Sequence, residues 1–204
     1  MNILAFGDSI TWGACDDEAG GWATRMRNKL AGKDIDVYNC GISGDNTDDL
    51  LLRFKIEAEA RKSKDKTVII FAIGINDSQY TGSRENTRVK SEKFTENLST
   101  LIEQAREIGS CILFIGLNRV EDDKLTPIPW SDKDQNYDNE NVSLYNSLIQ
   151  KVADENQLPF LDISELITEA DLEDGLHPNS SGHRKLAEAV EEFLNRQGDC
   201  YFLG

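Results

Sequence analysis

The chain has 204 residues, of which 37 are acidic and 22 are basic, and its net charge is −15. Nucleic acids and anionic membrane surfaces attract clustered Lys and Arg, so this charge argues against both as partners. No apolar stretch approaches the roughly 20 residues that a membrane-spanning helix needs, so no membrane span is expected. The length predicts a single domain over residues 1–204.

Apolar runs rich in β-branched residues alternate along the chain with runs of helical period. The expected strands are residues 2–6, 35–40, 67–73, 111–117 and 159–163. The expected helices are residues 21–31, 48–61, 91–108, 141–156 and 180–196. This alternation predicts right-handed βαβ units, and therefore an α/β fold: a three-layer α/β/α sandwich around a five-stranded parallel sheet, flavodoxin-like in outline.

A short polar segment follows four of the five expected strands. These segments are Gly7-Asp8-Ser9-Ile10, Gly41-Ile42-Ser43-Gly44-Asp45, Gly74-Ile75-Asn76-Asp77 and Asp174-Gly175-Leu176-His177-Pro178. In open α/β sheets, ligands bind at the carboxyl ends of the strands. The sequence therefore brings all four segments to one edge of the sheet and predicts a functional site there.

Ser9 is the candidate nucleophile. A serine hydroxyl is unreactive at neutral pH unless a base lies within hydrogen-bond reach. The chain has two histidines, and only His177 has a carboxylate, Asp174, at a spacing that lets it orient the imidazole. His183 stands in the last expected helix, where packing or local hydrogen bonding is its expected role. We therefore expect Ser9, His177 and Asp174 to form a catalytic triad.

Acyl transfer through a serine also requires hydrogen-bond donors for the oxyanion of the tetrahedral intermediate. The candidates are the backbone N–H groups of Ser9 and Gly44 and the side-chain amide of Asn76. Taken alone, Gly44 could equally be a turn glycine and Asn76 a helix cap. The neighbouring carboxylates of Asp8 and Asp77 are interpreted as structural groups that accept hydrogen bonds from loop N–H groups.

The four cysteines are Cys15, Cys40, Cys111 and Cys200, and their spacing matches no zinc-binding pattern. No metal site is therefore expected. The sequence begins without a basic leader, which predicts a cytoplasmic location. Because a reducing compartment disfavours disulfides, Cys40 and Cys111 are expected to be buried thiols in their strands.

Together, the four segments resemble the sequence blocks of the SGNH hydrolases, the GDSL-type esterases and lipases. Gly7-Asp8-Ser9-Ile10 resembles the block that carries the nucleophile, and Ser43-Gly44-Asp45 resembles the block of the oxyanion glycine. Gly74-Ile75-Asn76-Asp77 resembles the block of the oxyanion asparagine, and Asp174-Gly175-Leu176-His177-Pro178 resembles the block of the remaining triad residues. The resemblance implies the SGNH hydrolase fold and hydrolysis of a small-molecule ester without a cofactor.

The irregular residues 118–139 follow the fourth strand, so they are expected to cover the site and to influence substrate size. Trp130 in this stretch, Trp12 after the nucleophile and Tyr80 after Asn76 are expected to bind substrate as apolar walls. The expected function is hydrolysis of small to medium acyl esters. Two alternatives stay open, a carbohydrate O-acetylesterase and a non-catalytic flavodoxin-like binding protein.

Overall fold

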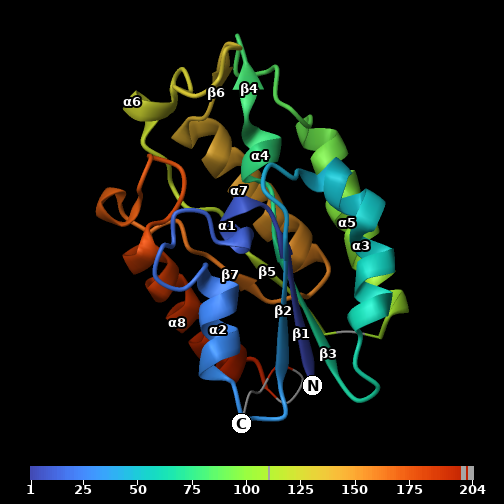
Figure 1. Cartoon of the computed structure of the whole chain (residues 1–204). Coiled ribbons are helices and arrows are strands. Elements are labelled where there is room, and N and C mark those ends of the chain that lie inside the picture. The colour runs from blue at the N-terminus through green and yellow to red at the C-terminus, as the bar shows by residue number, and fades with distance from the viewer. Residues whose placement is uncertain (110, 199–200, 202–204) are drawn as a thin grey trace.

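The structure is a computed structural model that describes residues 1–109, 111–198 and 201. Five parallel strands form one sheet in the order β2-β1-β3-β5-β7, and helices cover both of its faces (Figure 1). The strands of this sheet are β1 (Asn2–Gly7), β2 (Asp36–Gly41), β3 (Thr67–Ala72), β5 (Cys111–Ile115) and β7 (Phe160–Leu161). This architecture confirms the predicted three-layer sandwich.

Five long helices make up the outer layers. On one face, α2 (Trp22–Lys29) packs beside α8 (Ser180–Arg196); on the other, α3 (Thr47–Arg61), α5 (Ser91–Glu107) and α7 (Asn139–Glu155) pack in a row. Because both faces of the sheet are covered, its central strands β1, β3 and β5 have near-continuous apolar sequences, whereas the edge strand β2 does not. In the described residues, none of the helices is long and apolar enough to span a membrane.

The core on the α3 side contains phenylalanines at matching positions of neighbouring strands. Phe6 of β1 pairs with Phe71 of β3, which in turn pairs with Phe114 of β5. The ring of Phe54, from α3, has its centroid 4.9 Å from that of Phe6 and 5.2 Å from that of Phe71. Such tilted ring pairs add about 0.5–1.5 kcal/mol each to the burial of apolar surface. The row therefore favours the strand register that brings the carboxyl ends of β1, β3 and β5 level.

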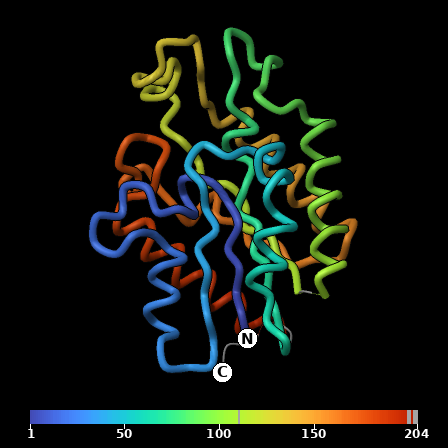
Figure 2. Tube along the Cα trace, turned by 45° about the vertical axis from the view of Figure 1, so that its right-hand side comes forward, coloured from blue at the N-terminus to red at the C-terminus, as the bar shows by residue number. Residues whose placement is uncertain are grey.

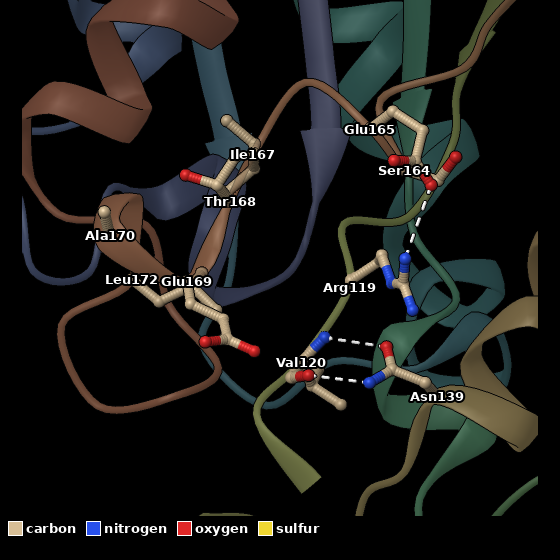
Figure 3. Close-up of a pocket in the computed structure, with 10 residues that line it drawn as sticks. All are labelled: Arg119, Val120, Asn139, Ser164, Glu165, Ile167, Thr168, Glu169, Ala170 and Leu172. Carbon is tan, nitrogen blue, oxygen red and sulfur yellow. Dashed lines mark hydrogen bonds and ion pairs between the residues drawn. The ribbon is translucent and has the colours of Figure 1, made fainter.

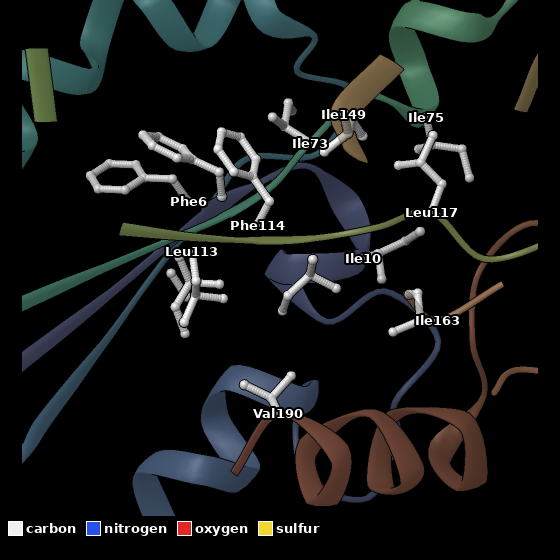
Figure 4. Close-up of a cluster of buried hydrophobic side chains, with 14 of the residues drawn as sticks. Phe6, Ile10, Ile73, Ile75, Leu113, Phe114, Leu117, Ile149, Ile163 and Val190 are labelled. Carbon is white, nitrogen blue, oxygen red and sulfur yellow. The ribbon is translucent and has the colours of Figure 1, made fainter. Parts of the chain in front are cut away.

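Aliphatic side chains fill the space on the opposite face of the sheet. Figure 4 shows Leu113 of β5 on the side of Val190 in α8, away from the face that carries Phe6 and Phe114. All four side chains are buried. Ile10 reaches into the same layer as Leu113, so the turn that follows β1 is anchored in the core.

The strand order predicts where on the sheet a ligand would bind. From β1 the chain crosses to β2 at the edge, and from β2 it returns past β1 to β3. Open parallel sheets bind ligands where the strand order reverses in this way, outside the carboxyl ends of the strands. Here that point lies between β1 and β3, which are followed by Ser9 and Asn76, respectively.

The structure also contains short elements that the sequence did not predict. They are α1 (Ser9–Trp12), α4 (Ile75–Ser78), β4 (Tyr80–Thr81), α6 (Asp122–Leu125), β6 (Gln135–Asn136) and the 3₁₀ helix η1 (Glu169–Asp171). An element of two to four residues is too short to show a hydrophobic period. Because β4 and β6 pair antiparallel, the segments that contain them rise together beyond the carboxyl ends of the main strands (Figures 1 and 2).

The cysteines match their expected state only in part. Cys40 is a buried free thiol, as predicted, and Cys15 is also free. Cys111 is disulfide-bonded and only partly buried. The expectation of a buried thiol there is wrong, because sequence spacing does not reveal which cysteines a fold brings together. Cys200 lies outside the described residues, and the cytoplasmic location stays a prediction.

Candidate active site

Ser9 stands at the first position of α1, just beyond the end of β1. The carboxylate of Asp8 caps this short helix by accepting a hydrogen bond from the amide of Ile10 (2.9 Å). The turn packs tightly, because a Cβ at Gly7 would lie only 2.3 Å from the carbonyl oxygen of Ala72. Glycine is therefore required at the end of β1, and the turn fixes Ser9 at the edge of the sheet.

Three side chains from opposite ends of the chain meet at this edge. Ser9 Oγ lies 2.9 Å from His177 Nε2, and His177 Nδ1 lies 2.7 Å from Asp174 Oδ2. A carboxylate can only accept a hydrogen bond, so Nδ1 carries the proton of the neutral ring and Nε2 is left to accept from the Ser9 hydroxyl. The structure thus brings together the three residues that the sequence predicts as a triad.

The segment that carries Asp174 and His177, residues 172–178, is called the His177 loop below. Asp174 Oδ1 accepts hydrogen bonds from the amides of Leu176 (3.0 Å) and His177 (2.9 Å), and Leu172 pairs with Pro178 across the base of the loop. Burial alone would raise the pKa of Asp174, but hydrogen bonds from the side chain and amide of His177 outweigh it and lower that pKa to about 2. Asp174 is therefore ionised near neutral pH and orients the imidazole.

The side-chain amide of Asn76 is fixed at both ends. Asn76 Nδ2 donates to the carbonyl oxygen of Asp45 (2.9 Å), and Asn76 Oδ1 accepts from the hydroxyl of Tyr137 (2.6 Å). Nδ2 therefore keeps its second N–H for a ligand. Burial raises the pKa of Tyr137, so its hydroxyl stays protonated and can donate. Sequence reasoning missed Tyr137, because it lies 61 positions from Asn76 and no local pattern links the two.

Gly44 has a left-handed backbone conformation, with φ of 85°, in the turn after β2. A Cβ there would meet no heavy atom within 4 Å, so the backbone conformation and not crowding favours glycine. The adjacent Asp45 is anchored by Arg53, whose Nε donates to Asp45 Oδ2 (2.7 Å) and whose Nη2 donates to the carbonyl oxygen of Gly7 (3.2 Å). Arg53, which the sequence did not single out, thus ties this turn to the end of β1.

Asp77 is a buried structural carboxylate, although its partner is distant in the sequence. Its two oxygens accept hydrogen bonds from the amide of Thr47 (3.0 and 3.2 Å), and Oδ1 also accepts from Thr47 Oγ1 (2.5 Å). Asp77 therefore joins α4 to the first turn of α3. Burial raises the pKa of Asp77 to about 7, against the lowering effect of the hydrogen bonds from Thr47.

The raised pKa of Asp77 predicts that stability depends on pH. An aspartic acid of the unfolded chain ionises at about pH 4, whereas Asp77 of the folded protein stays protonated up to about pH 7. Between these two values the folded state binds one more proton than the unfolded state, so the free energy of unfolding falls as pH rises. This group contributes at most about 1.4 kcal/mol per pH unit. Urea denaturation across this range should show a shallower fall for Asp77→Asn than for the unaltered protein. Equal slopes would contradict the prediction.

His183 has the local, structural surroundings that the sequence predicts. Its Nε2 lies 2.9 Å from the carbonyl oxygen of Ala14, and its Nδ1 accepts a hydrogen bond from the amide of Trp22 (3.2 Å). The side chain is fully buried, and burial lowers its pKa, so the ring stays neutral. Both ring nitrogens are engaged by backbone groups, which leaves His177 as the histidine that faces Ser9.

The three residues expected to bind substrate have different surroundings. Trp12 is 58% exposed and Trp130 is 55% exposed, whereas Tyr80 is only 6% exposed. Tyr80 belongs to β4, which pairs with β6, so the structure does not present it as part of an open wall. Ile42, in the turn after β2, is 45% exposed and was not singled out from the sequence. Trp12 and Ile42 therefore offer apolar surface on the turns that follow β1 and β2.

A pocket of about 430 Å³ lies beside the His177 loop, and Ser9 does not line it (Figure 3). Its walls come from the segment after β5, the start of α7 and the segment after β7. Asn139 fastens one wall, because its side chain bonds both the amide (3.0 Å) and the carbonyl oxygen (2.7 Å) of Val120. Leu172 lines the pocket and pairs with Pro178, so a ligand there would contact the base of the His177 loop.

Comparisons with known proteins agree with this geometry. The family model described as GDSL-like Lipase/Acylhydrolase matches residues 5–185. YpmR of Bacillus subtilis is 23% identical over 96% of this chain and 82% of its own length. A lipolytic G-D-S-L family protein from Veillonella parvula has a TM-score of 0.74 at 21% identity, covering 96% of this chain and 99% of that one. Axe2, an acetylxylan esterase from Geobacillus stearothermophilus, has a TM-score of 0.70 at 21% identity. The match covers 94% of this chain and 93% of Axe2.

The region that the family model matches contains all four polar segments of the sequence, from Gly7 to Pro178. The solved structures share the α/β fold over nearly the whole of both chains. The chain therefore belongs to the GDSL-like lipase/acylhydrolase family and is a carboxylic ester hydrolase.

Proposed function

We propose that this protein hydrolyses small to medium acyl esters through a Ser-His-Asp triad and an acyl-enzyme intermediate. The observation that carries the proposal is the pair of contacts from Ser9 Oγ to His177 Nε2 (2.9 Å) and from His177 Nδ1 to Asp174 Oδ2 (2.7 Å). A nucleophile, a base and a group that orients the base, each within hydrogen-bond reach of the next, can activate a serine. Family membership favours this enzyme over the flavodoxin-like binding protein.

In the first half of the reaction, Ser9 Oγ attacks the ester carbonyl carbon while His177 Nε2 takes the hydroxyl proton. The carbonyl oxygen becomes an oxyanion, and its donors are the amides of Ser9 and Gly44 together with Asn76 Nδ2. When the intermediate collapses, the bond to the alcohol oxygen breaks and His177 gives its proton to that oxygen. Asp174 remains ionised throughout and stabilises the imidazolium.

In the second half of the reaction, a water molecule attacks the acyl carbon while His177 Nε2 takes one of its protons. The second tetrahedral intermediate uses the same three oxyanion donors. When it collapses, the bond between the acyl carbon and Ser9 Oγ breaks, and His177 returns the proton to Oγ. The carboxylic acid leaves and the enzyme is restored, so the sequence of steps needs no cofactor.

The role of Asn76 predicts a loss of turnover without a matching loss of substrate binding. Asn76→Ala should lower kcat by about 10²–10³ and leave KM little changed, because an oxyanion donor acts mainly in the transition state. Tyr137→Phe removes the hydrogen bond that orients the amide, worth about 1 kcal/mol, and should lower kcat roughly fivefold. Steady-state kinetics with p-nitrophenyl acetate measures both effects.

Tyr145→Phe is the matched control for Tyr137→Phe. Tyr145 is also buried, and its hydroxyl lies 2.9 Å from Thr87 Oγ1 in the bond that joins α7 to the segment before α5. Its loss should lower stability and leave kcat nearly unchanged. If Tyr145→Phe lost as much kcat as Tyr137→Phe, or if Asn76→Ala changed only KM, the proposed oxyanion role of Asn76 would be wrong.

The substrate range is proposed from the surface that surrounds Ser9. The exposed side chains of Trp12 and Ile42 offer apolar contact to a short acyl chain or to the alcohol. The second candidate is a carbohydrate O-acetylesterase. It is considered because Axe2, which has a similar fold, is an acetylxylan esterase. An acetyl ester of a sugar would use the same triad and donors, so the two candidates differ only in the alcohol that the site accepts.

A panel of esters separates the two candidates. It contains p-nitrophenyl esters of rising acyl length, acetylated xylooligosaccharides and acyl-CoA, with the Ser9→Ala variant as the blank. We expect the highest kcat/KM among the short to medium p-nitrophenyl esters. A much higher kcat/KM on the acetylated sugars would favour the O-acetylesterase instead. No Ser9-dependent turnover of any member would contradict the proposed function.

A further inference from the structure

A thiol faces the proposed triad from the segment between α1 and α2. One ligand atom from each of Cys15, Asp174 and His177 lies within 4.8 Å of the other two. The three residues are partly exposed, so an ion from solvent can reach them. In the part of the chain that the structure describes, no other group of three His, Cys, Asp or Glu residues converges in this way. The proposed mechanism uses Asp174 and His177 and gives Cys15 no role.

The backbone around Cys15 is held from both sides. Cys15 has a left-handed conformation, with φ of 65°, which is uncommon for a residue that has a Cβ. The carbonyl oxygen of Ala14 bonds His183 Nε2 (2.9 Å), and the carboxylate of Asp16 accepts a hydrogen bond from the amide of Gly21 (2.8 Å). His183 and Asp16 are both buried. A fixed segment and not a mobile one therefore presents the thiol to the His177 loop.

The donor set has the chemistry of a zinc site. Thiolate, imidazole and carboxylate are the protein ligands that zinc prefers, at bond lengths of about 2.0–2.3 Å. A tetrahedron with such bonds places its ligand atoms about 3.5 Å apart. His177 Nδ1 and Asp174 Oδ2 lie 2.7 Å apart, so a zinc ion that binds both atoms would move them apart by about 1 Å. The thiol of Cys15 lies within 4.8 Å of a ligand atom of each residue, so it would move toward them by about 1 Å. Magnesium and calcium prefer oxygen ligands and fit this set poorly.

We propose that Cys15, Asp174 and His177 form an inhibitory zinc site that turns the esterase off when it is occupied. The inhibition rests on the proposed function, whereas the binding does not. Asp174 lies beside His177 Nδ1, so a zinc ion shared by the two residues binds that nitrogen. The ring proton then moves from Nδ1 to Nε2, which can no longer accept the proton of Ser9. The thiol proton of Cys15 passes to solvent, and removal of zinc restores the triad.

Binding and inhibition are measured separately on one set of proteins. Isothermal titration calorimetry with zinc chloride measures binding to the unaltered protein and to Cys15→Ala, Cys40→Ala and Ser9→Ala. Cys40→Ala is the matched control, because Cys40 is a free thiol that is buried in β2. Ser9→Ala keeps all three ligands but lacks the nucleophile. For the three proteins that keep Ser9, inhibition is read as the loss of p-nitrophenyl acetate turnover with rising zinc, relative to each protein's own zinc-free rate.

We expect zinc to bind the unaltered protein, Cys40→Ala and Ser9→Ala alike. Binding to Cys15→Ala should be at least about tenfold weaker, since loss of even an outer-shell partner of a metal typically costs that much. Inhibition should weaken by the same factor, and EDTA should reverse it. Equal zinc affinity of Cys15→Ala and Cys40→Ala, or no zinc binding by the unaltered protein, would overturn the site. Binding that requires Cys15 but leaves turnover unchanged would overturn the inhibitory role. Cys15-dependent binding by a protein without ester turnover would instead count against the proposed function.

Discussion

The Ser9→Ala variant is expected to hydrolyse p-nitrophenyl acetate about 10⁴–10⁶ times more slowly than the unaltered protein. Alanine removes Oγ, the atom that lies 2.9 Å from His177 Nε2. The Asp8 cap and the tight packing at Gly7 involve other atoms and can stay in place. The residual rate should come from the oxyanion donors and substrate binding alone. The values of kcat and KM for the two proteins measure the effect.

Ser147→Ala is the control for this prediction. Ser147 is exposed on α7, and its hydroxyl donates to the carbonyl oxygen of Ser143 within the same helix. This variant should keep the turnover of the unaltered protein, and circular dichroism should show that both variants are folded. A folded Ser9→Ala protein that kept a tenth or more of the activity would exclude Ser9 as the nucleophile.

The two histidines are expected to give opposite results when each is replaced by alanine. His177→Ala should be about as damaging to kcat as Ser9→Ala, because removal of the base leaves the hydroxyl without an acceptor for its proton. His183→Ala should keep kcat within a few fold but lower the free energy of unfolding by about 1–3 kcal/mol, since it leaves the partly buried carbonyl oxygen of Ala14 and the buried amide of Trp22 without this partner.

Kinetics and urea denaturation of both histidine variants separate catalysis from stability. His177 lies on a loop whose backbone is held by Asp174 and by the pairing of Leu172 with Pro178. His177→Ala should therefore unfold at nearly the same urea concentration as the unaltered protein. An inactive but stable His183→Ala protein, together with an active His177→Ala protein, would show that the triad is assigned to the wrong histidine.

The parts of the fold that extend over many residues could be predicted from the sequence. The observed α8 has the expected bounds, because Asn179 caps its first turn by accepting from the amides of Ser181 and Gly182, and the apolar face that follows is long. The strand expected at residues 159–163 is shorter in the structure, where β7 pairs with β5 alone. Ile163 is buried beyond the end of this pairing, so an apolar run marks burial and not the length of the strand.

The site was predictable where it depends on strand ends and on local spacing. What the sequence missed are residues that only the tertiary fold brings together, such as Tyr137, which bonds Asn76, and Cys15, which lies near the His177 loop. Arg53 belongs to the same class, because its main partners lie on other elements. The burial of Tyr80 follows from the pairing of β4 with β6, and two-residue strands leave no pattern in a sequence.

Mass spectrometry of the protein after reaction with a fluorophosphonate tests most directly whether Ser9 is the nucleophile. Intact mass should show one adduct per chain, and peptide mapping should place it on Ser9. The adduct should be absent from Ser9→Ala and should form far more slowly in His177→Ala, since the base that activates the hydroxyl lies 2.9 Å away in the unaltered protein. A protein that hydrolyses esters but carries the adduct on another residue, or none at all, would contradict the proposed mechanism.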